Sequence, residues 1–170
     1  MVKIPLYGQD GTVRDYVLVD DADAEFVMRF RWHKDNCGYA RRHETGKGRR
    51  ERRAALMMHR EILGLAPGRY PNVDHRNGNR LDNRRQNLRA CTPAQNCMNR
   101  RKPRGGAAFK GVTKNTCGEK WQACIYHEGK RIHLGSFDTP EQAAAAYDKE
   151  SSRLRGEFAV TNSELGLLKG

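Results

Sequence analysis

The sequence has no long hydrophobic run, and apolar residues make up only 37% of its 170 positions. A helix that spans a membrane needs about 20 consecutive apolar residues, so this lack argues against an integral membrane protein. The low apolar content also argues against one large hydrophobic core. The length suits one domain of ordinary size or two small ones.

Secretion signals and regular cysteine motifs are lacking as well. The segment from Met1 to Leu6 has no apolar stretch of leader length, and no small-residue cleavage site accompanies it. We therefore expect a cytoplasmic protein without a signal peptide. The five cysteines are an odd number without a CxxC pair, which argues against a zinc ribbon and in favour of reduced thiols.

Acidic residues are scarce relative to basic ones, since 20 Asp and Glu stand against 32 Lys and Arg, for a net charge of +12. Lys and Arg gain free energy by displacing counterions from phosphates, so the balance predicts a polyanionic partner. The basic run from Arg41 to Arg53 is either a solvated loop or a phosphate-contacting arm. Residues 100–108 combine basic residues with Pro and Gly, which is typical of a linker. A linker that carries Arg100 and Arg101 would lie close to a DNA backbone.

Residues 109–165 show the pattern of a small sheet followed by a helix. Apolar and polar side chains alternate over residues 121–126 and again over 131–134, with a turn between the two runs. A helix is predicted to begin after Thr139, which is a good N-cap before a proline. We expect a three-stranded antiparallel sheet packed on one helix. The free face of that sheet can enter a major groove with Tyr126, Arg131 and His133.

Residues 54–99 hold the polar side chains that suit phosphodiester hydrolysis. A strand is expected to end at Asp74-His75, and a second strand is expected over 88–91, after a loop that opens with an Asn-Gly turn. A short helix then begins at Thr92-Pro93. This order of strand, loop, strand and helix should bring Asp74 and His75 near Asn96.

The three residues brought together in this way cover the needs of the reaction. Histidine is the natural general base because its ordinary pKa lies near the working pH, so His75 is the candidate base. Asp74 and Asn96 supply oxygen ligands, which suit magnesium or manganese rather than zinc. Two protein oxygens leave most of the coordination sphere for water and phosphate.

The string DHRNGNRLDNRRQNLRACTPAQN, from Asp74 to Asn96, resembles the HNH endonucleases of the phage- and intron-encoded homing type. In this variant, Asn takes the place of the last His. The resemblance implies a ββα-metal fold, also called a His-Me finger. It implies His75 as general base, Asp74 and Asn96 as metal ligands, and Asn87 as the residue that fixes the loop and the histidine. His59 matches an upstream His-Arg element of the group and is a candidate phosphate contact.

The last third of the chain resembles the ethylene-response-factor (APETALA-type) DNA-binding domain. The segments that carry the resemblance include FKGV at 109–112, LGSFDT at 134–139 and LRGEFA at 154–159. It implies that the sheet enters the major groove. The candidate DNA-contacting residues here are Lys110, Lys114, Lys120, Tyr126, Arg131 and His133. The chain departs from the plant pattern at Thr113, Asn115, Cys117 and Cys124, so the plant target preference is not carried over.

The sequence thus predicts an α+β protein in three parts. These are an HNH nuclease domain over 1–99, with leading strands over 1–53 and a ββα-metal core over 54–99, a linker over 100–108, and a sheet-and-helix DNA-binding domain over 109–165. We expect duplex DNA as partner, Mg²⁺ or Mn²⁺ as cofactor and no obligatory protein partner, with a monomer or weak dimer acting in a bacterial host or phage-infected cell.

The predicted function is that of a metal-dependent, site-directed DNA endonuclease of the homing type. Two alternatives stay open. One is a transcription regulator that binds DNA through the C-terminal domain and carries a degenerate nuclease domain. The other is a basic RNA-binding protein. RNA readout normally stacks bases on exposed aromatic side chains, and the aromatic residues of this chain are expected to be mostly buried.

Overall fold

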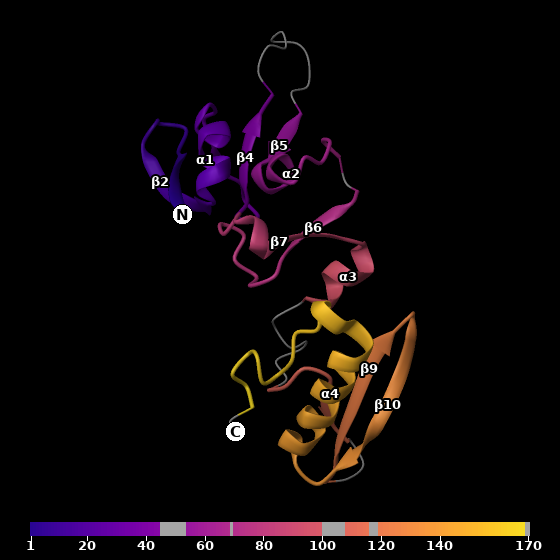
Figure 1. The fold of residues 1–170 in the computed structure, drawn as a ribbon. Helices are drawn as coiled ribbons and strands as arrows, with labels where there is room; N and C mark the ends of the chain where they lie inside the picture. Colours follow the sequence, from indigo (N-terminus) through magenta and orange to yellow (C-terminus); the bar gives the residue numbers. More distant parts are fainter. Residues whose placement is uncertain (45–53, 69, 100–107, 116–118, 169–170) are drawn as a thin grey trace. The chain divides into compact units, whose positions relative to one another are not determined.

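Residues 1–44, 54–68, 70–99, 108–115 and 119–168 are described by a computed structural model, shown in Figure 1. The chain divides into two compact units, residues 1–93 and 94–170. Most of the expected basic arm, nearly all of the expected linker, and both Arg100 and Arg101 lie outside the described residues. In the described ranges, no helix is both long and apolar enough to cross a membrane.

The first unit is a set of small antiparallel sheets with short helices, as Figure 1 shows. In chain order, its elements are β1 (Val2–Tyr7), β2 (Val13–Val19), α1 (Asp21–Met28), β3 (His33–Lys34), β4 (Ala40–His43), β5 (Ala55–Met57), α2 (Met58–Ile62), β6 (Asn72–His75), η1 (Arg85–Asn87) and β7 (Leu88–Cys91). Strands β1 and β2 form one sheet, β3, β4 and β5 a second, and β6 and β7 a third.

One hydrophobic core joins these small sheets. The alternating pattern of β1 and β2 turns one side of the hairpin inward, and Trp32, which is fully buried, packs in the same cluster. The indole Nε1 of Trp32 donates a hydrogen bond of 2.7 Å to the carbonyl oxygen of Val27 at the end of α1. Val73 on β6 and Leu88 on β7 belong to the same core. The leading strands therefore hold the hairpin that carries the Asp-His pair.

The β6–β7 hairpin matches the expected strand, loop and strand. Its register places Asp74 opposite Arg89 and His75 opposite Leu88. The observed β7 has the bounds predicted from the sequence. The short helix predicted after it is α3 (Pro93–Met98), which begins at the boundary between the two units and has no buried residue.

The second unit is a three-stranded antiparallel sheet packed on one helix, which confirms the predicted architecture. Its elements are β8 (Val112–Lys114), β9 (Trp121–His127), β10 (Lys130–Phe137), α4 (Pro140–Arg155) and η2 (Gly156–Phe158), and β9 is the central strand. Figure 1 shows α4 lying along β9 and β10. Thr139 is the N-cap of α4, and its Oγ1 accepts a hydrogen bond of 3.2 Å from the backbone N–H of Gln142.

The alanines of α4 let the helix lie close to the sheet. Ala143 and Ala144 are fully buried against Val112 and Ala123 of the sheet. The backbone of Gly111 also lies close to α4. Its φ is +73°, and a Cβ built there would lie 2.0 Å from Cδ2 of Tyr147.

Replacing Gly111 with Ala tests this approach. The new methyl group clashes with a buried ring in a left-handed backbone, so the free energy of unfolding of the second unit should fall by roughly 2–5 kcal/mol. The matched control is Gly129→Ala, which has a φ of +77° but no atom within 4 Å of the added Cβ. The control should lose only about 1–2 kcal/mol. Urea unfolding followed by Trp121 fluorescence in a Trp32→Phe background measures both, and equal losses would contradict the close packing.

Candidate active site

His75 lies at the end of β6 and is only 5% exposed. Its Nε2 lies 2.9 Å from Oδ1 of Asn83, a side chain that is itself completely buried. An amide oxygen accepts hydrogen bonds and cannot donate them, so Nε2 carries the ring proton. The lone pair of the neutral imidazole is therefore on Nδ1, which is the nitrogen that can take up a proton.

Two further rings surround the imidazole of His75. The ring centroid of His59 lies 5.3 Å away in an edge-to-face arrangement, and that of Tyr39 lies 5.8 Å away. Tyr39 and His59 also contact each other at 5.2 Å, and the guanidinium of Arg80 lies 4.8 Å from the centroid of Tyr39. The structure thus brings the rings of Tyr39, His59 and His75 together, although β4, β5, α2 and a loop separate Tyr39 from the strand that carries His75.

Burial controls the charge of both histidines. Burial lowers the pKa of His75, against the opposing effects of the Asn83 hydrogen bond and the nearby carboxylates of Asp74 and Asp82. Burial, assisted by the proximity of His75, lowers the pKa of His59 to about 3. Both rings are consequently neutral at neutral pH, which is the state that a general base requires.

Asn87 ties together the loop between β6 and β7. Its Oδ1 accepts a hydrogen bond of 2.9 Å from the backbone N–H of Asn77, and its Nδ2 donates one of 2.7 Å to the backbone oxygen of Asp82. The side chain of Asn77 in turn donates to Oδ2 of Asp82 at 2.8 Å. This is the geometry of a loop-fixing residue, and it sets the backbone that presents Asn83 to His75.

Asp74 precedes His75 on β6 and lies opposite Arg89 in the register of the hairpin. It is 4% exposed, and its Oδ2 lies 2.6 Å from a terminal nitrogen of Arg89 and 2.8 Å from Nε. A carboxylate can accept about four hydrogen bonds, and Arg89 occupies part of that capacity. The donor chemistry of Asp74 fits a hard cation.

The second expected metal ligand, Asn96, lies on α3 with an exposed side chain, in the unit that does not contain Asp74. Its amide oxygen is also a donor that suits magnesium or manganese. Among the residues that the structure describes, no group of three or more His, Cys, Asp or Glu side chains is placed to hold a metal ion. The pairing of Asp74 with Asn96 stays a prediction.

The His-Arg element on α2 has a second function that the sequence did not indicate. The guanidinium of Arg60 donates hydrogen bonds to the backbone oxygens of Ala66, Tyr70 and Pro71, the shortest of them 2.6 Å to Pro71. Arg60 is buried, so these charge-assisted bonds hold the segment that leads into β6. His59 packs against His75, the candidate base. Its neighbour Arg60 holds the segment that leads into β6, the strand that carries His75.

Residues 57–98 match the family model described as HNH endonuclease. The chain contains an HNH endonuclease domain. The matched span begins just before α2 and includes β6, β7 and α3, so it covers His59, His75, Asn83 and Asn87. The enzyme class predicted from the sequence, a hydrolase that cleaves DNA, is confirmed at this level.

Relatives are similar to the chain in two different ways. The "Uncharacterized HNH endonuclease L560" of Acanthamoeba polyphaga mimivirus is 29% identical over 140 residues, which is 80% of this chain and 68% of that protein. "APETALA2-like protein 2" of Oryza sativa subsp. indica is 48% identical over 63 residues, and "AP2-like ethylene-responsive transcription factor PLT2" of Arabidopsis thaliana is 42% identical over 64 residues. These two matches cover 36% of this chain but only 14% and 11% of the plant proteins.

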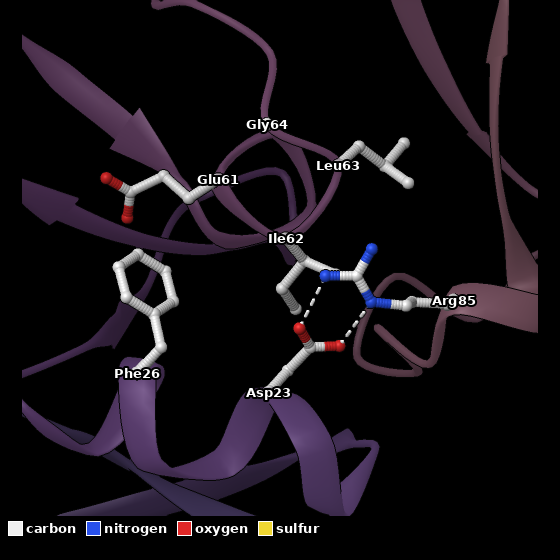
Figure 2. Close-up of a pocket in the computed structure, with 7 residues that line it drawn as sticks. All are labelled: Asp23, Phe26, Glu61, Ile62, Leu63, Gly64 and Arg85. Carbon is white, nitrogen blue, oxygen red and sulfur yellow. Dashed lines mark hydrogen bonds and ion pairs between the residues drawn. The ribbon is translucent and has the colours of Figure 1, made fainter.

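The first unit also has a pocket of about 440 Å³ where α1, α2 and η1 meet. Figure 2 shows Arg85 reaching toward Asp23 across the pocket, with Phe26 and Ile62 nearby. Arg85 and Asp23 form a two-point ion pair with distances of 2.8 and 2.6 Å. Because Arg85 lies two residues before Asn87, this ion pair links the N-terminal helix to the active-site loop.

The second unit presents some of the expected DNA-contacting residues on its free sheet face, opposite α4. Tyr126 on β9 is 60% exposed and pairs across the strands with Arg131 on β10. His133 pairs with Cys124 on the same face and is exposed. The alternation read from the sequence therefore places Tyr126, Arg131 and His133 as expected.

The three expected lysines differ in their surroundings, and only Lys110 is buried. Lys110 is 7% exposed, and its ammonium donates a hydrogen bond of 2.7 Å to the backbone oxygen of Val160, so the expectation that it faces a groove is corrected. Its place in the chain, just before β8, gave no sign of this burial. Lys114 lies 5.9 Å from the ring centroid of Trp121. Lys120 is exposed and forms an ion pair of 3.5 Å with Asp138.

The lowered pKa of His59 predicts a pH-dependent stability of the HNH domain. The unfolded chain binds a proton at His59 near pH 6.5 and the folded chain only near pH 3, so the unfolded state binds more protons in between. Stability should therefore be complete above about pH 6.5 and fall as the pH drops toward 3, by a few kcal/mol in total. His59→Gln should lose less stability between pH 7.5 and 5 than the parent chain does.

The measurement is urea unfolding in a Trp121→Phe background, so that the buried Trp32 reports on the HNH domain alone. His43→Gln is the control, because His43 is exposed in the same unit. The control should follow the parent chain at both pH values. A His59→Gln variant with the same pH dependence as the parent would contradict the assignment of a buried, neutral histidine.

Proposed function

We propose that this chain is a metal-dependent endonuclease of the homing type, which cleaves duplex DNA at preferred sites with His75 as general base. The observation that carries the proposal is the buried His75–Asn83 hydrogen bond within the HNH match. Burial leaves the imidazole neutral, and the hydrogen bond to Asn83 places the basic lone pair on Nδ1. A water molecule beside Nδ1 would lose its proton to this nitrogen as it attacks a phosphate.

The other residues of the site act through His75. Asn83 fixes the tautomer and the orientation of the ring, and Asn87 fixes the loop that carries Asn83. The rings of His59 and Tyr39 pack against the imidazole and exclude water from its sides. A general base held in this way contributes about 10²–10⁴-fold to the rate.

Asp74 and Asn96 are the proposed ligands of Mg²⁺ or Mn²⁺, because they supply the oxygen donors that these cations prefer. When bound, the ion stabilises the charge that develops on the phosphate and on the leaving oxygen. Arg89 orients the carboxylate of Asp74. The products are proposed to carry 3′-hydroxyl and 5′-phosphate ends.

The second unit is proposed to select the site of cleavage as an ethylene-response-factor-type domain. A major groove admits a two-stranded β-ribbon, and β9 and β10 present such a ribbon with Tyr126, Arg131 and His133 on its free face. The similarity to the two plant proteins supports this part of the proposal. Arg100 and Arg101 are proposed to contact phosphates next to the site. A single catalytic centre in a monomer would nick one strand.

A transcription regulator with an inactive nuclease domain is the second candidate. The plant relative named as a transcription factor favours it, as does the ion pair that Arg89 makes with a proposed metal ligand. Incubation of supercoiled plasmid with the purified chain and a series of divalent metals separates the two candidates. Nicked or linear product requires the endonuclease. Tight binding with intact plasmid in every metal would leave only the regulator.

The His75→Ala variant should lose cleavage by about 10²–10⁴-fold, because it removes the proposed general base. Duplex binding should be unchanged, since the proposed reading surface lies in the second unit. Plasmid nicking and gel-shift titration measure the two properties on the same preparation. A parallel loss of binding and cleavage would assign His75 a role in folding instead.

Asn83→Leu tests the positioning of the base. The variant keeps the side-chain volume but removes the acceptor for Nε2, so kcat should fall at least tenfold while KM for DNA stays near the parent value. Asn36→Leu is the control, because Asn36 is exposed in the same unit and should retain both constants. An Asn83→Leu protein that folds and cleaves at the parent rate would show that the contact does not orient His75.

A further inference from the structure

Three side chains on the free sheet face of the second unit form a contact group, and the proposed function gives no role to one of them, Cys124. Sγ of Cys124 lies 3.1 Å from a terminal nitrogen of Arg131 and 3.7 Å from Nδ1 of His133. Cys124 and His133 are direct cross-strand partners on β9 and β10. The register of the sheet therefore places the sulfur between two basic side chains, and both of these are exposed.

Hydrogen-bond chemistry determines which atoms of this group donate and which accept. Arginine has donors and no acceptor, so the sulfur of Cys124 accepts from Arg131. The S–H proton of Cys124 can then be donated to Nδ1 of His133, whose remaining nitrogen, Nε2, carries the ring proton. The result is two donors on one face, the guanidinium of Arg131 and Nε2–H of His133, joined through the thiol.

We propose that Cys124 is a positioning residue that holds Arg131 and His133 as a pair of donors for the major-groove edge of a guanine. The inference rests on the proposed function, because it assumes that this sheet face reads duplex DNA. Among the bases, guanine alone presents two acceptors in the major groove, at N7 and O6, and an array of donors without an acceptor matches that edge.

The thiol is needed because Arg131 is long and exposed. A free arginine side chain has about 2 kcal/mol of rotamer entropy to lose when it binds a base. The Cys124 contact restricts the guanidinium before DNA arrives, which is preorganisation. A hydrogen bond of ordinary net strength corresponds to an effect of roughly two- to tenfold on binding. This fold-change should appear in base discrimination and not in sequence-independent affinity.

The test uses the full chain in EDTA, so that bound DNA is not cleaved, with a random-sequence duplex pool as probe. The variants are Cys124→Ala, Cys124→Val, Arg131→Ala and the double variant Cys124→Ala/Arg131→Ala. Cys37→Ala is the control, because this cysteine is exposed in the other unit. Selected sequences give the base preference, and the salt dependence of binding to a fixed duplex gives the phosphate contribution.

The parent chain and Cys37→Ala should select guanine at one position, which Arg131→Ala abolishes. Both Cys124 variants should weaken that same preference by about two- to tenfold with the salt dependence unchanged. The double variant should match Arg131→Ala, since removing the positioning residue costs nothing once its target is gone. Cys124→Val keeps the size of the side chain, so a role in packing alone would leave this variant like the parent and overturn the proposal.

Two further results would also overturn it. If Cys124→Ala and Arg131→Ala have additive effects, the two residues act independently. If the preference lost in the Cys124 variants is at a different base pair from that lost in Arg131→Ala, the thiol reads DNA itself. Should the parent chain select no sequence at all, site selection by the second unit fails, and this inference fails with it, whereas plasmid cleavage by the HNH domain would be unaffected.

Discussion

The hydrogen bond between Nε2 of His75 and Oδ1 of Asn83 is the contact on which the active site depends. Both groups are buried, so neither can exchange its partner for water without cost. Burial alone would keep the imidazole neutral but would leave open which nitrogen carries the proton. The amide oxygen decides this, because it requires the proton on Nε2 and leaves the lone pair on Nδ1.

The loop that holds Asn83 is built almost entirely from polar side chains. Asn87, Asn77 and Asp82 satisfy one another and the backbone between the two strands. In the described part of the chain, Nδ1 of His59 and Nδ2 of Asn83 are buried atoms without a hydrogen-bond partner. Both belong to residues that contact His75, which is where unsatisfied groups are expected to serve function more than stability.

The two units handle positive charge differently. In the HNH domain, the guanidinium groups of Arg60 and Arg89 are buried on carbonyls or a carboxylate, and the exposed Arg85 is paired with Asp23. In the second unit, Arg131 and His133 remain on a sheet face that no other described element of that unit covers. A net charge of +12 therefore overstates the number of cations that can reach DNA, because several serve the fold.

The sequence was sufficient where a local pattern fixes the structure. The alternation over 121–126 gave β9, the Thr139 cap gave the start of α4, and the spacing from Asp74 to Asn87 gave the hairpin with its loop. It was insufficient where partners are distant in the chain. Nothing near Tyr39 indicates that its ring lies against His75, and a lysine preceding a strand gives no sign that its ammonium is buried, as in Lys110.

The order of residues by itself determined the HNH motif, the candidate base and the two-part architecture, because turn chemistry, capping and strand periodicity act over a few residues. Only the tertiary structure decided which nitrogen of His75 is basic, that Arg60 holds the incoming strand, and that Cys124 contacts Arg131. These features depend on side chains from separate strands and loops meeting in a packed interior or across a sheet. Such meetings are set by the register and packing of the whole unit, and no short segment of sequence contains them.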